Sequence, residues 1–271
     1  MSHLMNNYGR LPVSFDHGQG VWLWDKEGHK YLDALAGIAV NSVGHAHPRL
    51  VRAIADQASK LIHCSNYFNI DLQEKVAEKL VEHSGLEAVF FCNSGLEANE
   101  CAIKIARKFG HAKSIEVPNI IVLKHAFHGR SIATLSATGN PSVREDFSPY
   151  TEGFIFVDES DLDGIRKIVE ENKNVVAIFF EPILGEGGVV PIDLSVIKGI
   201  REICDEHDLL MMCDEVQCGM GRSGKWFAHQ WAEIKPDVIT MAKGLAGGVP
   251  VGAVIVSEKA NIFKPGNHGS T

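Results

Sequence analysis

The sequence predicts an α/β fold with a mostly parallel sheet flanked by helices. Short runs of four to six apolar residues recur from residue 88 onward. Segments with helical periodicity separate several of these runs, and polar or glycine residues follow the runs directly. Strands buried on both faces read as continuous apolar runs, and their alternation with helices is typical of a parallel sheet covered on both sides.

The part of the chain after residue 87 supplies the strands of this sheet. Strands are expected at residues 88–92, 120–123, 154–157, 175–180, 209–213, 238–241 and 252–256. Helices are expected between them at residues 96–108, 162–170 and 194–207, where apolar residues recur with helical spacing. No internal repeat, low-complexity stretch or disordered linker interrupts the pattern.

The first 45 residues lack this rhythm. Residues 21–33 alternate apolar and other positions around a turn-rich centre, which predicts a short β-hairpin. Pro48 suits the first turn of a helix, so we expect helices over residues 48–61 and 70–83. The N-terminal 45 residues are therefore expected to be organised separately from residues 46–271.

Composition excludes several classes of protein. The 271 residues hold 26 Lys and Arg against 34 Asp and Glu, a formal charge of −8 without a basic run. This charge argues against nucleic acid or an anionic membrane as the main partner. In addition, no apolar stretch approaches the ~20 residues that a membrane span requires. The first residues lack the apolar core of a secretory signal, and six cysteines without a CxxC pair predict a reduced, cytoplasmic protein.

Polar residues or glycine directly follow four of the expected strands. The strands at 88–92, 175–180, 209–213 and 238–241 are followed by Asn93-Ser94-Gly95, Glu181 to Glu186, Asp214-Glu215 and Ala242-Lys243-Gly244, respectively. In open α/β sheets, ligands bind outside the carboxyl ends of the strands. These segments therefore predict one site built from distant parts of the chain.

Two of these ends suggest specific chemistry. Ser94 and Gly95 stand between a strand and a helix, so the unpaired N–H groups of the first helical turn could bind an anion. The alternative is that Ser94 merely caps the helix. Lys243 follows a buried strand, where desolvation would lower its pKa and make its amine a nucleophile, although most lysines are solvated surface residues.

The carboxylates of Asp214 and Glu215 are expected to point to opposite faces because they are neighbours at a strand end. One of them can therefore face the site, and the alternative for either is a surface charge or a helix partner. A phosphate cradle, an aromatic side chain, one carboxylate and a buried lysine are together the set that pyridoxal 5′-phosphate (PLP) requires.

Other motifs are better explained as structure. Residues 219–224 read GMGRSG, but no strand stands directly before them and Trp226 replaces the Ser or Thr that a P-loop needs. His45-x-His47 and His125-x-x-His128 lack further ligands at metal-binding spacing, so we expect structural histidines and no metal. The GxSxG motif of serine hydrolases is absent.

Five motifs give the chain a resemblance to the class III, ornithine-type, PLP-dependent aminotransferases of fold type I. They are NSGLEANE at 93–100, FHGR at 127–130, EPILGE at 181–186, DEVQCGMGR at 214–222 and AKG at 242–244. The resemblance extends from Tyr8 to Thr271. The segments YGRLPV at 8–13 and GIAVN at 37–41 are most similar to the acetylornithine subgroup.

The resemblance implies a role for each cofactor-binding position. Lys243 would form the Schiff base with PLP and then carry the proton between carbon centres. Asp214 would pair with the pyridine nitrogen and Gln217 with the ring hydroxyl, while Val216 and Phe127 would pack on opposite faces of the ring. The phosphate would be held by Ser94, Gly95 and the backbone of Leu96, and by Thr271 from a partner subunit.

The resemblance also implies substrates and assembly. Arg130 would bind a substrate carboxylate with help from Tyr8, and Glu186 would switch the site between its two substrates. The expected reaction moves the terminal amino group of N-acetylornithine to 2-oxoglutarate in arginine biosynthesis, within a homodimer. Ornithine, succinylornithine and 4-aminobutyrate aminotransferases are the alternatives.

Family members continue beyond the Gly269-Ser270-Thr271 motif. The resemblance therefore implies that residues 1–45 belong to a small α+β domain whose remainder is absent, and that residues 46–271 form the large PLP-binding domain. A truncated, inactive PLP-fold fragment is the alternative to an enzyme.

Overall fold

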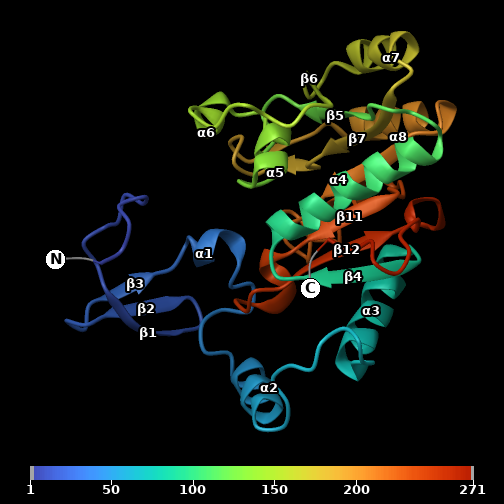
Figure 1. Ribbon diagram of the computed structural model, residues 1–271. Helices are drawn as coiled ribbons and strands as arrows, with labels where there is room; N and C mark the ends of the chain where they lie inside the picture. The colour runs from blue at the N-terminus through green and yellow to red at the C-terminus, as the bar shows by residue number, and fades with distance from the viewer. Residues whose placement is uncertain (1–2, 270–271) are drawn as a thin grey trace. The chain divides into compact units, whose positions relative to one another are not determined.

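The computed structural model describes residues 3–269 (Figure 1). The chain divides into two compact units, Met1–His63 and Cys64–Thr271. In this division residues 46–63 group with the N-terminal unit. The sequence analysis assigned them to the large PLP-binding domain, and that domain boundary stays a prediction. His45 is tied into the first unit by backbone hydrogen bonds with Gly20 of 2.8 and 2.9 Å, and by a 2.6 Å contact between its Nε2 and Asp33 Oδ2. The chain therefore does not leave this unit at residue 45.

The N-terminal unit holds a three-stranded antiparallel sheet. Its strands are β1 (Phe15–Gln19), β2 (Trp22–Asp25) and β3 (Lys30–Leu32), and its helices are α1 (Ala36–Ala39) and α2 (Pro48–Ala58). The hairpin expected over residues 21–33 is confirmed as β2 and β3, which pair antiparallel. Pro48 occupies the first turn of α2 as expected, because this position needs no N–H donor.

The second unit is built on a seven-stranded sheet in the order β4-β12-β11-β10-β7-β5-β6. The strands are β4 (Ala88–Cys92), β5 (Asn119–Leu123), β6 (Phe154–Val157), β7 (Val175–Phe180), β10 (Leu210–Asp214), β11 (Val238–Met241) and β12 (Gly252–Val256). β12 pairs antiparallel with both β11 and β4, and the other pairings are parallel. The predicted mostly parallel sheet is therefore confirmed.

Helices and short segments complete this unit. The helices are α3 (Asp71–Ser84), α4 (Gly95–Ala112), α5 (Ile132–Ala137), α6 (Pro141–Arg144), α7 (Leu162–Glu171) and α8 (Leu194–Glu206). The short strands β8 (Ile183–Leu184) and β9 (Val190–Pro191) pair with each other, and the 3₁₀ turns are η1 (Ala228–Ala232), η2 (Lys243–Ala246) and η3 (Glu258–Ala260). Among residues 3–269, no helix combines the length and the apolar character that crossing a membrane requires.

Helices cover both faces of the sheet, which explains the continuous apolar runs. In Figure 1, α4 crosses in front of the strands, and its Ala102 and Ala106 pack with Val122 on that face. α7 and α8 contribute Ile165 and Ile200 to the core of the opposite face. All six residues of β7 are buried, because its side chains alternate between the two cores.

The sheet topology brings several strand ends to one edge. β4, β5, β7, β10 and β11 run in the same direction, since β4 is linked to β11 through the antiparallel β12. The residues that follow these strands therefore share one edge of the sheet. This is the edge where the sequence predicted a site.

Candidate active site

Asp214 ends β10 and is held in a single orientation by three donors. Its side chain is only 3% exposed. Oδ2 accepts a hydrogen bond from Asn99 Nδ2 at 2.7 Å and lies 2.8 Å from His128 Nδ1. Oδ1 accepts the backbone N–H of Val216 at 3.0 Å. These contacts offset the cost of burying a carboxylate and aim it toward α4.

The neighbouring carboxylate of Glu215 points to the other face of the sheet, as predicted. It accepts the backbone N–H groups of Ala228 at 2.7 Å and His229 at 2.8 Å, and its Oε1 lies 2.9 Å from His229 Nδ1. Glu215 therefore holds the η1 turn, and only Asp214 of this pair faces the predicted site.

The N-terminus of α4 begins immediately after β4. Ser94 Oγ accepts the N–H of Glu97 at 3.2 Å, and the Glu97 carboxylate accepts the N–H of Asn93 at 2.6 Å. Ser94 thus caps the helix, which was the alternative considered for it. Capping leaves the N–H groups of Gly95 and Leu96 without intrahelical acceptors, so this terminus can still bind an anion.

Three strand ends meet at Gly95. A Cβ atom placed on Gly95 would lie 2.7 Å from Val216 Cγ1 and 3.4 Å from Ala242 Cβ. Glycine is therefore required sterically at this point. The contact also shows that the N-terminus of α4, the segment after β10 and the residue before Lys243 converge.

Lys243 opens η2 with a backbone φ of 43°, in the left-handed region that non-glycine residues rarely adopt. Its side chain is half-buried, and burial lowers the pKa of its amine, while the negative charge of Asp214 opposes that shift. Among the described residues, the Lys243 ammonium has no hydrogen-bond or ion-pair partner. An amine that is partly desolvated and unpaired is suited to act as a nucleophile.

Phe127 and Arg130 lie on the loop after β5. Phe127 is half-buried, and the guanidinium carbon of Arg130 lies 5.7 Å from the centre of its ring. Arg130 is exposed and has no ion-pair partner among the described residues. This loop therefore presents an aromatic face and a free cation together.

Glu181, which follows β7, connects this loop to the next one. Its Oε1 accepts the N–H of Phe127 at 2.8 Å and its Oε2 accepts the N–H of Gly185 at 3.1 Å. Burial raises the pKa of Glu181 to about 7, and the charge of Asp214 adds to the rise. A Cβ atom on Gly185 would lie 2.1 Å from Gln217 Oε1, so the Gln217 side chain packs against this loop.

Glu186 follows on the same loop and is exposed. The structure thus brings together, in the second unit, the predicted positions around Ser94, Phe127, Asp214 and Lys243. Tyr8 belongs to the N-terminal unit, where it is 69% exposed. Thr271 lies outside the described residues. The roles expected for Tyr8 and Thr271 stay predictions.

Sequence reasoning assigned no role in the site to three buried residues that contact it. Asn99 and His128 bind Asp214, and Glu181 binds the Phe127 loop. His128 was read only as a structural histidine, and its ring does stack on Phe179 with centroids 4.0 Å apart. All three lie inside the family-like motifs, which is the signal that could have identified them.

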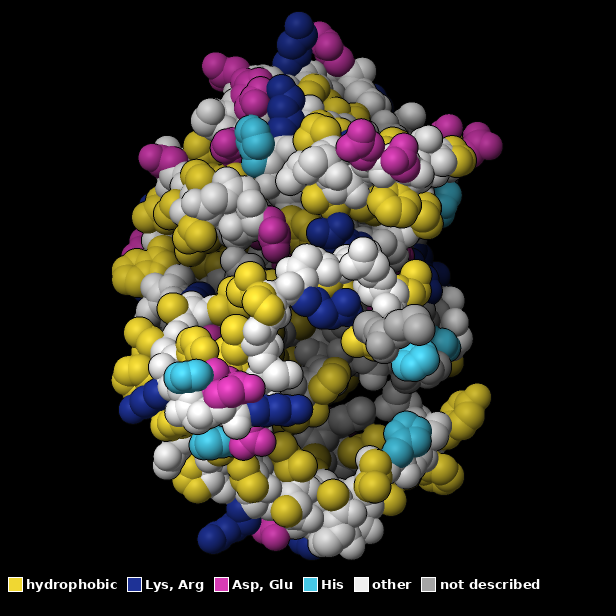
Figure 2. Space-filling view, turned by 90° about the vertical axis from the view of Figure 1, so that its left-hand side faces the viewer, with side chains coloured by type: hydrophobic (Ala, Val, Ile, Leu, Met, Phe, Trp, Pro, Cys, Tyr) yellow, Lys and Arg dark blue, Asp and Glu magenta, His cyan; other side chains and the backbone are white. Residues whose placement is uncertain are grey.

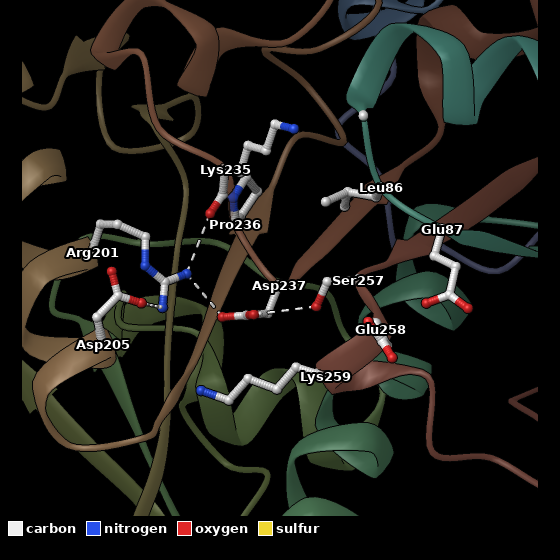
Figure 3. A pocket seen from close by; sticks show the side chains of 11 residues that line it. Leu86, Glu87, Arg201, Asp205, Lys235, Pro236, Asp237, Ser257, Glu258 and Lys259 are labelled. Carbon is white, nitrogen blue, oxygen red and sulfur yellow. Dashed lines mark hydrogen bonds and ion pairs between the residues drawn. The ribbon is translucent and has the colours of Figure 1, made fainter.

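A separate hollow of about 840 Å³ lies at the opposite edge of the sheet (Figure 3). It is lined by Glu87, Asp237 and Ser257, which stand just before β4, just before β11 and just after β12. The Arg201 guanidinium there pairs with Asp237 at 2.9 Å and with Asp205 at 2.8 Å. None of the predicted site residues lines this hollow, so its size does not identify it as the place of chemistry.

Within residues 3–269, no group of three or more His, Cys, Asp or Glu is arranged to hold a metal ion. Residues 216–227 form turns and bends. A dinucleotide-binding motif would open a helix, and the GMGRSG segment does not. All six cysteines are free thiols.

The residues present fit PLP. The N-terminus of α4 offers N–H donors to a phosphate, and the missing Cβ of Gly95 lets this terminus lie against Val216 and Ala242. Asp214 is a buried, oriented carboxylate, and Lys243 is an unpaired amine with a lowered pKa. An α/β sheet with this donor set at its carboxyl edge defines a PLP-dependent enzyme of fold type I.

Comparison with known proteins gives the family. Residues 4–271 match the family "Aminotransferase class-III", and the chain belongs to this family of PLP-dependent aminotransferases. An acetylornithine aminotransferase of Nitrosomonas europaea is 54% identical over 100% of this chain and 69% of its own length. One from a Synechocystis species is 49% identical over 100% of this chain and 64% of its own length.

Solved structures agree with this assignment. The ornithine aminotransferase of Toxoplasma gondii superposes with a TM-score of 0.94 at 35% identity, over 99% of this chain and 65% of its own. The N-acetylornithine aminotransferase of Stenotrophomonas maltophilia gives a TM-score of 0.81 at 39% identity, over 93% and 64%. The predicted family and fold are confirmed, and the chain spans about two thirds of the length of these relatives.

Proposed function

We propose that the protein transfers the terminal amino group of N-acetylornithine to 2-oxoglutarate, giving N-acetylglutamate semialdehyde and glutamate. The observation that carries the proposal is the half-buried Lys243 amine at the strand edge that also holds the oriented Asp214 carboxylate. The substrate is supported by relatives of 46–54% identity that are named acetylornithine aminotransferases. Arginine biosynthesis is the corresponding biological role.

The described residues divide the work of holding the cofactor. The N–H groups of Gly95 and Leu96 would bind its phosphate at the positive end of α4. Phe127 and Val216 would pack on the ring, and Gln217 would bind the ring hydroxyl. Asp214, which Asn99 and His128 keep in place, would pair with the ring nitrogen.

Lys243 is the catalytic residue of the proposed reaction. Bound PLP supplies an electron-withdrawing ring that stabilises negative charge at the reacting carbon. The lowered pKa of Lys243 leaves more of its amine neutral, so it can bind the cofactor and then accept and return a proton. Partial burial limits the access of water to this amine.

Substrate selection is assigned to residues at the rim. Arg130 presents an exposed guanidinium, whose planar fork matches a carboxylate. Glu186, exposed on the next loop, would switch the site between its two substrates. These assignments follow the family motifs.

An assay with four amines tests the proposal. The chain is incubated with PLP, 2-oxoglutarate and N-acetylornithine, ornithine, succinylornithine or 4-aminobutyrate, and glutamate is measured. We expect the highest kcat/KM for N-acetylornithine and no product from Lys243→Ala. A higher value for another amine would replace the proposed substrate, and no glutamate from any amine would favour an inactive fragment.

We also propose that the protein is a homodimer in the cytoplasm. Tyr67, Phe68 and Leu72 of the second unit are 96%, 68% and 51% exposed, an apolar group that a second copy could cover. On the face shown in Figure 2, Lys and Arg side chains are scattered among Asp and Glu rather than gathered into a basic patch. Light scattering that gave a stable monomer would contradict the dimer.

A further inference from the structure

Glu181 is a buried carboxylate that the proposed reaction does not use. It follows β7 directly and is 5% exposed. Because Phe180 pairs with Cys213, Glu181 and Asp214 stand at equivalent positions on neighbouring strands and both point to the α4 face. Glu181 thus lies beside the cofactor-binding carboxylate.

Each oxygen of Glu181 holds a different loop. Oε1 accepts the N–H of Phe127, on the loop after β5, at 2.8 Å, and Oε2 accepts the N–H of Gly185, on the loop after β7, at 3.1 Å. The first loop carries the aromatic ring and Arg130. The second packs against the Gln217 side chain and leads into Glu186.

We infer that Glu181 is a positioning residue that fixes the Phe127 ring and the Gly185 loop relative to each other, and so sets the placement of PLP. The inference rests on the proposed function. One side chain links the two loops at this point. A change in Glu181 would therefore shift both Phe127 and the Gly185 loop, against which Gln217 packs.

The charged and titratable groups that face Glu181 are those of the site itself. Asp214 and His128 are the neighbours whose charges act on it, and Lys243 is affected by its charge. Glu215 offers a comparison, because it is also buried and also accepts two backbone N–H groups, but on the other face of the sheet. Glu215 holds the η1 turn, and its Oε2 also accepts the Cys218 thiol at 3.5 Å.

Glu181→Gln tests the inference, with Glu215→Gln as the matched control. The amide has one acceptor oxygen, so its NH₂ group must face the N–H of Phe127 or of Gly185 and break that contact. In the cofactor-free protein we expect faster hydrogen exchange in peptides that span residues 125–130 and 183–188. With PLP, we expect altered visible circular dichroism and roughly tenfold weaker binding.

Glu215→Gln should lower the melting temperature and leave both the exchange of these peptides and the visible circular dichroism as in the wild type. If Glu181→Gln does not fold, Glu181→Asp, which withdraws the carboxylate by one carbon, should change the same signals. Unchanged circular dichroism in a folded Glu181 variant would overturn the inference. A wild type without a visible cofactor band would overturn the proposed function, and the inference with it.

Discussion

Asn99→Ala gives the sharpest test of how Asp214 is held. Asn99 is 2% exposed, and its Nδ2 lies 2.7 Å from both Asp214 Oδ2 and the carbonyl oxygen of His128. Loss of a hydrogen bond to a buried charge costs about 1.5–3 kcal/mol, and an unsatisfied buried carbonyl costs about 1–3 kcal/mol. Asn99 Oδ1 is buried and has no partner among the described residues. Removing this unsatisfied oxygen therefore offsets the loss of stability by about 1 kcal/mol.

The expected decrease in the free energy of unfolding is therefore about 1.5–5 kcal/mol. Urea unfolding of the cofactor-free protein measures it, and PLP titration should show weaker binding because Asp214 loses a donor. Asn66→Ala is the control: Asn66 is exposed and accepts one bond from Gln73 at 3.1 Å, so a change within about 0.5 kcal/mol is expected. If Asn99→Ala also stays within about 0.5 kcal/mol of the wild type, the account of Asp214 is refuted.

Three further predictions concern single residues around the site. Gly95→Ala places a Cβ atom 2.7 Å from Val216 Cγ1, so it should lower PLP affinity and the melting temperature; wild-type values of both would contradict the close approach. Because the pKa of Glu181 rises from 4.5 to about 7 on folding, the folded state binds its proton more tightly, and the free energy of unfolding should fall as pH rises from 4.5 to 7. That fall is at most roughly 3 kcal/mol, and urea unfolding of Glu181→Gln should show it reduced; an identical pH profile would reject the shift. Arg130→Lys should raise the KM for the substrate whose carboxylate Arg130 binds more than it lowers kcat, and steady-state kinetics with an unchanged KM would remove Arg130 from that role.

The strands were predictable because burial on both faces of the sheet requires a continuous run of apolar residues in each strand. β4 and β7 consist almost wholly of apolar residues, and the structure places both where the sequence expected them. β1 was not predicted, because Phe15–Gln19 has one apolar residue in five and no alternation. The contacts of His45 with Gly20 and Asp33 could not be predicted, because they depend on tertiary structure.

The candidate site was only partly predictable. Lys243 and Asp214 stand out because a charged residue at the end of an apolar run is unusual. Asn99 and His128 give no such signal, because neither is a charged residue at the end of an apolar run. Their contacts with Asp214 join positions 115 and 86 residues apart, which only the fold brings together. Glu181 has the same type of position as Asp214, but only the structure shows that its oxygens bind the loops of Phe127 and Gly185.

The central claim is that Lys243 is the residue that holds PLP and carries out the transfer. The most direct measurement is the visible absorbance of the purified chain with PLP, before and after dialysis, for the wild type and Lys243→Ala. We predict a cofactor band that survives dialysis in the wild type and is lost in the variant. A wild type without the band, or a variant that keeps it, would contradict the claim.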